Sequence, residues 1–300
     1  MRLLAVIPAI TLVAALILSF LCLFAGHKKD FMEDYHLLTL NVSRLGENIL
    51  NESRSSDNTL TNLLNEFTND ITSEINDAIG EVTEELGIDD FYSAHLLDYC
   101  YGQYTPVEAA NGTVSQSDIS KNVTGCSNQT AMFWFNPTEI LERKLNESGV
   151  GVSLDDLNWP QDIQAGLDAL RIVSVTSFVL YCIAIGLIFV SLVATAVAFF
   201  GSGRLSACLN FMLAFLAFLA VGIASGLMTA VVVKGSSVIN EYGNQIGVQA
   251  HRGNKFLAIT WAATALVFIA MCYWTVETCF PSGRRNNAAK AGKFGRPSKV

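Results

Sequence analysis

Long stretches of apolar residues alternate with polar segments along this chain. Four such stretches occupy residues 3–25, 172–200, 205–233 and 256–280. The first three contain no charged residue, and the fourth contains only Glu277. Because about 20 apolar residues suffice to cross the hydrocarbon core of a bilayer, this pattern predicts four membrane-spanning helices.

The spans divide the chain into a series of segments. We expect a first span with a short start (residues 1–26), a loop domain (27–171), spans two to four (172–281) with a short second loop (234–255), and a basic tail (282–300). The first stretch could instead be a cleaved signal peptide beginning at Arg2. Its apolar core is long for a signal peptide and no A-x-A site follows, so we expect it to remain as a span.

The hydrophobic pattern of the loop domain predicts a long amphipathic helix. Apolar residues recur every three or four positions from Leu60 to Leu86, and Asp57 and Gly87 are suitable caps. The apolar face of this helix either packs on the rest of the loop or associates with a partner.

Four shorter elements are predicted before and after this helix. Weaker helical periodicity runs through 38–49 and through 139–145, and another helix is expected to lead from Trp159 into the second span. Residues 131–135 are expected to form a strand. The predicted fold class is therefore a mainly α membrane protein, a four-helix transmembrane bundle with a large, partly helical loop.

Composition and charge support this class. The chain is 51% hydrophobic and 15% charged, which is too apolar for an ordinary soluble domain. Residues 27–171 hold 25 acidic against 8 basic side chains, whereas the tail holds six basic residues and no acid. Such partitioned charge indicates two environments and makes nucleic-acid binding improbable. The basic residues of the tail are Arg284, Arg285, Lys290, Lys293, Arg296 and Lys299.

Three observations predict the orientation in the membrane. All six N-x-S/T sequons lie in the loop domain, at Asn41, Asn51, Asn111, Asn122, Asn128 and Asn146. Sequons suit an extracellular segment, and a basic tail favours the cytosol. The cysteines of the loop suit an oxidising compartment. Lys28 and Lys29 oppose this orientation, but we expect both termini in the cytosol and the loop outside.

Only two cysteines, Cys100 and Cys126, lie outside the apolar stretches. We expect a disulfide between them, which could contribute about 3 kcal/mol to stability. The alternative is a metal site, for which only His95 offers a further ligand. Cys208 and Cys279 lie near the expected cytosolic boundary, where they either accept palmitoyl groups or pack as small apolar side chains.

The spans contain two further features. Gly222 and Gly226 form a G-x-x-x-G pattern, which lets helices approach closely either within one chain or between copies. Glu277 lies within a turn of the expected interface, so we expect it to meet water or headgroups rather than to form an ion or proton site. The basic tail either binds anionic inner-leaflet lipid or only sets the topology.

The sequence contains no recognised catalytic motif. It has no G-x-S-x-G, H-E-x-x-H or P-loop pattern, and its four histidines are scattered. The spans are apolar and continuous, unlike those of most transporters. We therefore expect no enzyme activity and no cofactor or metal.

The motif in the loop resembles that of a known family. Its elements are the run Phe91-Tyr92-Ser93, the apolar pair Leu96-Leu97, and Tyr99-Cys100-x-Gly102, followed by Cys126. With the four spans, these elements are similar to those of the fungal Sur-seven/PalI family of claudin-like tetraspan proteins. The W-G-L-W pattern of claudins is missing, so the resemblance does not imply a paracellular barrier.

The resemblance implies a plasma-membrane protein that organises stable, eisosome-associated cortical domains. Such proteins support cell-wall integrity, endocytosis and membrane lipid organisation. The expected partners are membrane lipids, other copies or cortical-domain proteins, and the cell wall. The alternatives are an accessory of ambient-pH signalling, as in the PalI branch, and a cell-fusion or septation factor. PalI proteins carry a long tail that this chain lacks, which favours the cortical-domain branch.

Overall fold

The fold was analysed in a computed structural model, which describes residues 5–45, 87–105, 120–149, 153–155, 162–200 and 204–279. The predicted helix at 60–86, the basic tail, and the sequons at Asn51 and Asn111 lie outside the described residues.

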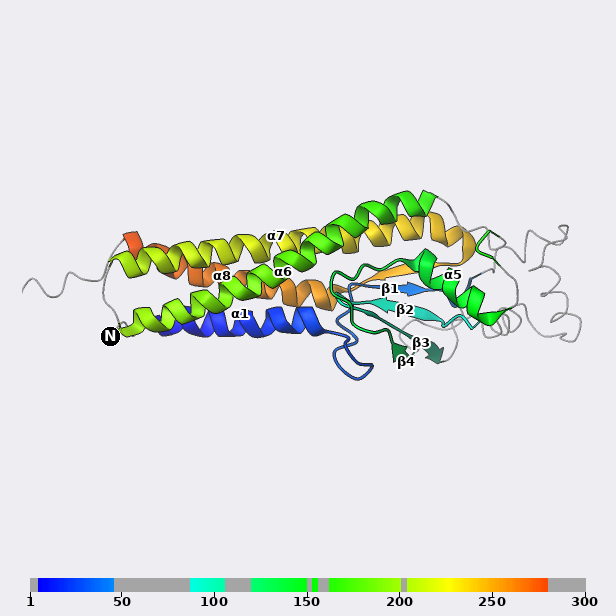
Figure 1. Cartoon of the computed structure of the whole chain (residues 1–300), viewed down its shortest axis with the longest axis horizontal. Coiled ribbons are helices and arrows are strands. Elements are labelled where there is room, and N and C mark those ends of the chain that lie inside the picture. The colour runs from blue at the N-terminus through cyan, green and yellow to red at the C-terminus, as the bar shows by residue number, and fades with distance from the viewer. Residues whose placement is uncertain are drawn as a thin grey trace, which may run out of the picture. The chain divides into compact units, whose positions relative to one another are not determined.

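Four long helices confirm the predicted spans. They are α1 (Val6–Phe24), α6 (Asp162–Phe200), α7 (Arg204–Gly243) and α8 (Asn254–Cys279), and each contains an apolar segment long enough to cross a membrane (Figure 1). The helices α6 and α7 have 39 and 40 residues. At 1.5 Å per residue each is about 60 Å long, roughly twice the thickness of a hydrocarbon core. Both helices therefore continue well beyond the membrane.

The chain forms two compact units, and each of the four helices contributes to both. The first unit contains residues 1–19, 181–222 and 261–300. Its core is built largely from buried alanines on all four helices, including Ala15, Ala184, Ala217 and Ala270. Small side chains allow helix backbones to approach closely, which is the usual packing in membranes.

The second unit contains residues 20–180 and 223–260 and is built around an antiparallel sheet. The strand order is β4-β3-β2-β1-β5. The strands are β1 (Leu38–Asn41), β2 (Phe91–Ala94), β3 (Tyr99–Thr105), β4 (Ser120–Cys126) and β5 (Gln249–Arg252). The edge strand β5 comes from the segment between α7 and α8, where only a short loop was expected.

One face of the sheet carries the core of this unit. Leu40 and Tyr92 pack there with residues of three helices: Leu141 of α5 (Pro137–Ser148), Leu167 of α6 and Ile239 of α7. Figure 1 shows α5 across the sheet. The α5 helix confirms the helical pattern predicted at 139–145. It begins at a proline and is followed by Gly149, which has a left-handed φ of 69°.

Two local predictions were wrong. Residues 131–135 form no strand, because Phe133 and Phe135 pack irregularly around the ring of Tyr99. The helical pattern starting at Leu38 begins instead with strand β1, which is paired on both sides. All four β1 residues are buried, so tertiary pairing overrides the local pattern.

A bulge in the β3–β4 pair explains Gly102. The register shifts between Tyr101 and Gly102, which leaves Thr124 without a cross-strand partner. A Cβ atom at position 102 would lie 2.1 Å from the carbonyl oxygen of Asn122. Only glycine fits here without moving the β4 backbone.

We expect Gly102→Ala to lower the free energy of unfolding by roughly 1–3 kcal/mol, because it forces two strands apart. Thermal unfolding of the purified protein in detergent measures the effect. The matched control is Gly186→Ala on α6, where an added Cβ meets nothing within 4 Å. Equal melting temperatures for the two variants would contradict the close approach at Gly102.

Candidate functional site

The sheet brings the residues of the sequence motif together. Phe91, Tyr92 and Ser93 form β2, and Tyr99 and Gly102 lie on the neighbouring β3. Since side chains alternate along a strand, Tyr92 and Tyr99 enter the core shared with the helices. Phe91 and Ser93 occupy the opposite face.

The predicted disulfide joins two directly paired residues. Cys100 of β3 lies opposite Cys126 of β4, and their sulfurs are bonded. The Cys100 sulfur also lies 3.3 Å from the carbonyl oxygen of Gly26, just after α1. The disulfide therefore links the edge strand β4 to its neighbour β3 and contacts the chain where it leaves the first span.

A row of polar groups crosses the sheet beside the disulfide. Thr39, Ser93 and Cys100 lie opposite one another on β1, β2 and β3. The hydroxyl oxygens of Thr39 and Ser93 are 3.2 Å apart, and the ammonium of Lys121 donates to Thr39 over 3.0 Å. Lys121 also lies 5.0 Å from the ring centre of Phe91, and burial lowers its pKa. The sequence motif gave no sign of this lysine.

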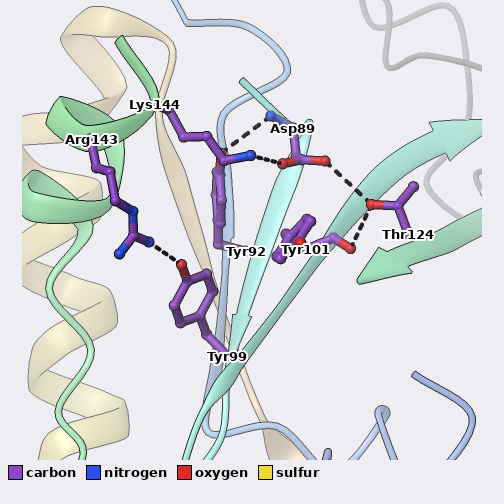
Figure 2. Close-up of polar contacts among 7 residues, drawn as sticks. All are labelled: Asp89, Tyr92, Tyr99, Tyr101, Thr124, Arg143 and Lys144. Carbon is purple, nitrogen blue, oxygen red and sulfur yellow. Dashed lines mark hydrogen bonds and ion pairs between the residues drawn. The ribbon is translucent and has the colours of Figure 1, made fainter. Parts of the chain in front are cut away.

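Two basic residues of α5 contact tyrosines of β3 (Figure 2). Arg143 donates a hydrogen bond to the phenolic oxygen of Tyr99. The ammonium of Lys144 lies 5.0 Å from the ring centre of Tyr101 and 3.2 Å from a carboxylate oxygen of Asp89. These contacts fix the position of α5 on the sheet in addition to the apolar core.

Asp89 also connects the strands of the motif. Its backbone N–H donates to the hydroxyl of Tyr92 over 3.2 Å. The hydroxyl of Thr124, at the bulge, lies within hydrogen-bond distance of both the Asp89 carboxylate and the Tyr101 carbonyl (Figure 2). Burial is the main reason that the pKa of Tyr92 is raised well above its usual value. The tyrosine therefore stays neutral and structural.

The turn between β2 and β3 contacts the end of the first span. His95 packs so closely on Gly26 that a Cβ there would lie 2.3 Å from the imidazole, and Gly26 has a φ of 80°. Burial lowers the pKa of His95 to about 3. Burial also lowers the pKa of nearby His36 to about 4, and its Nδ1 lies 3.1 Å from the Glu33 carbonyl oxygen. Both imidazoles are therefore neutral at ordinary pH.

Asp98 closes the same turn as a buried carboxyl group. Its side chain is 0% exposed, and the backbone N–H of His95 donates to its main-chain carbonyl over 2.8 Å. Burial raises the pKa of Asp98 to about 7, although the side chain of Gln129 lowers it somewhat. The neutral form is therefore favoured in the folded state over much of the acidic range.

The structure distinguishes among the four sequons that it describes. Asn122, Asn128 and Asn146 are exposed, so each can carry a glycan without disturbing the fold. Asn41 is only 4% exposed on β1, and its side-chain oxygen accepts hydrogen bonds from the backbone and hydroxyl of Ser43. Folding therefore leaves no space for a glycan at Asn41.

The glycine pair of the third span has two different environments. An added Cβ at Gly222 would lie 3.8 Å from Thr264 on α8, which places this glycine at a contact between helices of one chain. A Cβ at Gly226 would meet nothing within 4 Å. The second glycine is therefore exposed on the surface of α7.

The structure also describes three other residues singled out in the spans: Glu277, Cys208 and Cys279. The expected exposure of Glu277 is wrong: the side chain is 8% exposed on α8 and interacts within the fold. Cys208 and Cys279 are exposed, which is compatible both with palmitoylation and with packing as small apolar side chains.

Within the described parts of the chain, no three His, Cys, Asp or Glu side chains are placed to hold a metal ion.

The pKa of Asp98 predicts a pH-dependent stability. The unfolded carboxyl ionises near pH 4, whereas the folded one resists ionisation until about pH 7. Stability from this group is therefore complete below pH 4 and is lost as the pH rises to 7. We expect Asp98→Asn to stabilise the protein by roughly 2–4 kcal/mol at pH 8 and to have little effect below pH 4.

Thermal unfolding of the detergent-purified protein between pH 4 and 8 measures this difference against wild type. Asp155→Asn is the matched control, since Asp155 is exposed and its replacement should change stability little at any pH. A pH-independent difference between wild type and Asp98→Asn would contradict the prediction.

Comparisons with known proteins agree with the motif and the spans. A sequence profile of the SUR7/PalI family matches residues 4–273. The SUR7 family protein pun1 of Schizosaccharomyces pombe is 25% identical over 205 residues, which are 62% of this chain and 64% of that protein. The match thus spans less than two thirds of the relative's length. No solved structure matches the chain. Because the profile covers nearly the whole sequence, this multi-pass membrane protein belongs to the SUR7/PalI family.

Proposed function

We propose that this protein is a non-enzymatic organiser of stable cortical domains in the fungal plasma membrane, and that it supports cell-wall integrity, endocytosis and membrane lipid organisation. The observation that carries this proposal is the attachment of the sheet to the helices. Leu167 of α6 and Ile239 of α7 belong to the same core as the sheet residue Leu40. The sheet and the adjoining parts of α6 and α7 therefore share one hydrophobic core, which supports a scaffold role.

The edge strand β5 supports the same reading. It joins α7 to α8 and pairs with β1 from Leu38 to Asn41. The amide of Asn240 strengthens the connection through hydrogen bonds of 3.0 and 2.6 Å with the backbone of Ala250. The β5 edge of the sheet is therefore continuous in the chain with α7 and α8, which supports a packed domain rather than an extended loop.

For the orientation, we propose that both termini are cytosolic and that the loop domain is extracellular. A disulfide between Cys100 and Cys126 is stable in an oxidising compartment. The exposed sequons and the basic tail favour the same orientation. In the cytosol the tail would meet anionic lipid, with about 1 kcal/mol for each basic residue close to the surface.

Lateral association with other copies or with cortical-domain proteins is the proposed mechanism. Gly222 is occupied by a contact within the chain, whereas Gly226 lies on an open helix surface. The face of α7 around Gly226 therefore remains available for a second helix. A role as an accessory of ambient-pH signalling is the second candidate, because the matched family includes PalI proteins.

Glycan mapping tests the orientation. In a fungal host we expect Asn128→Gln and Asn146→Gln each to remove one endoglycosidase-sensitive increment of mass. Asn41→Gln is the matched comparison and should leave the mass unchanged, because Asn41 is buried. Loss of no increment from any exposed sequon would contradict an extracellular loop domain.

Photobleaching tests the function. With a fluorescent tag after Val300, we expect static patches at the cell edge that do not recover. Gly226→Leu should speed recovery if α7 mediates association. Gly186→Leu changes an open glycine on α6 and should not. A diffuse signal with fast recovery in the wild type would rule out the cortical-domain proposal and favour the signalling role.

A further inference from the structure

Two exposed lysines directly after the first span have no role in the proposed function. Lys28 and Lys29 follow α1, which ends at Phe24, and their charge opposes the proposed orientation. Both side chains are exposed, and neither forms an ion pair with another residue that the structure describes. The described part of the fold therefore gives these two charges no structural purpose.

The length of α1 places these lysines at the membrane surface. The helix has 19 residues. At 1.5 Å per residue it is about 28 Å long, and a hydrocarbon core is about 30 Å thick. Because α1 is only just long enough to cross, Phe24 lies at the edge of the core. Lys28 follows four residues later, in the headgroup layer that adds about 5–8 Å on each side.

A tight turn keeps the chain at this depth. Gly26 has a left-handed φ of 80° directly after the helix. The backbone N–H of Gly26 donates to the carbonyl of Phe31 over 3.0 Å, and the N–H of Phe31 donates to the carbonyl of Lys28 over 2.9 Å. Residues 28–31 therefore form a closed turn that returns to the end of α1 instead of leading away from the membrane.

The turn also presents an apolar ring beside the span. Phe31 is 37% exposed, and its ring centre lies 4.6 Å from that of His27. In the last turns of α1, Phe20 and Phe24 are exposed to a similar extent, at 43% and 40%. The ring of Phe31 thus extends the lipid-facing surface of α1. Exposed apolar groups bordered by charged residues are typical of contacts with a membrane.

The local balance of charge favours an anionic partner. The carboxylate of Asp34 is paired with the ammonium of Lys255, at the start of the fourth span, over 2.5 Å. Within the turn itself, Lys28 and Lys29 face only one acidic residue, Asp30. The turn therefore carries a net positive charge, and a cation close to the membrane surface attracts anionic lipid.

We propose that the turn at residues 28–31 binds the phosphate-bearing head of an anionic membrane lipid. Lys28 and Lys29 contact the head, and the ring of Phe31 lies in the boundary between heads and acyl chains. The proposal is independent of the cortical-domain function and of the orientation of the protein, because the turn lies at the membrane surface in either orientation.

Photolabelling tests the proposal. The full chain is reconstituted in phosphatidylcholine nanodiscs with a photoactivatable phosphatidylglycerol, or with a photoactivatable phosphatidylcholine as the neutral probe. These heads share the phosphate and differ in net charge. We expect the phosphatidylglycerol probe to label residues 24–35 at least about fivefold more strongly, as two lysines near the surface imply. Equal labelling by both probes, or no labelling of this segment, would overturn the proposal.

Three variants separate charge recognition from structure, with labelling of the basic tail as the internal reference. Lys28→Gln combined with Lys29→Gln should reduce labelling of the turn by phosphatidylglycerol roughly tenfold. Lys28→Arg combined with Lys29→Arg keeps the charge and should retain the labelling, and Asp30→Asn should increase it. All three should melt like wild type, because these side chains are exposed. Unchanged labelling in the glutamine variant, or equal loss in the glutamine and arginine variants, would refute the site.

Discussion

The pairing of Cys100 with Cys126 is the constraint on which the loop domain depends. The strands of the sheet come from distant parts of the chain: β1 ends at Asn41, and β2 begins at Phe91. Closing the loop between two strands costs conformational entropy, and the disulfide removes part of this cost for the pair β3 and β4, because it already closes residues 100–126 in the unfolded state. The disulfide pair is also the first pair in the register of β3 and β4, and the bulge at Gly102 lies two residues beyond it.

The disulfide also lies against the chain just after the first span. Its sulfur touches the backbone at Gly26, and the adjoining turn places His95 against the same residue. On the other face, the core joins α5, α6 and α7 to the strands. In this chain the motif therefore joins the sheet to the end of the first span. Its residues are explained by packing, by close approach and by the covalent link.

The sequence was sufficient to predict the spans, because each is a continuous apolar run with a direct physical meaning. It also predicted the disulfide and the α5 helix. The short strands were missed because β1 and β2 are buried on both faces, so neither shows the alternation of a half-exposed strand. The partner of β1 at its other edge, β5, lies some 200 residues away, and no local pattern indicates that pairing. The burial of Asp98 and Glu277 likewise depends on tertiary contacts.

The pairing of β5 with β1 has a consequence for dividing the protein. A soluble fragment limited to residues 27–171 would lack β5 and the part of the core that α7 supplies. Its first strand would then expose unpaired backbone groups along one edge, together with the side chains that Ile239 normally covers. Open edges of this kind recruit strands from other molecules. Antibodies or binding partners selected against such a fragment would meet a surface that the intact membrane protein keeps covered.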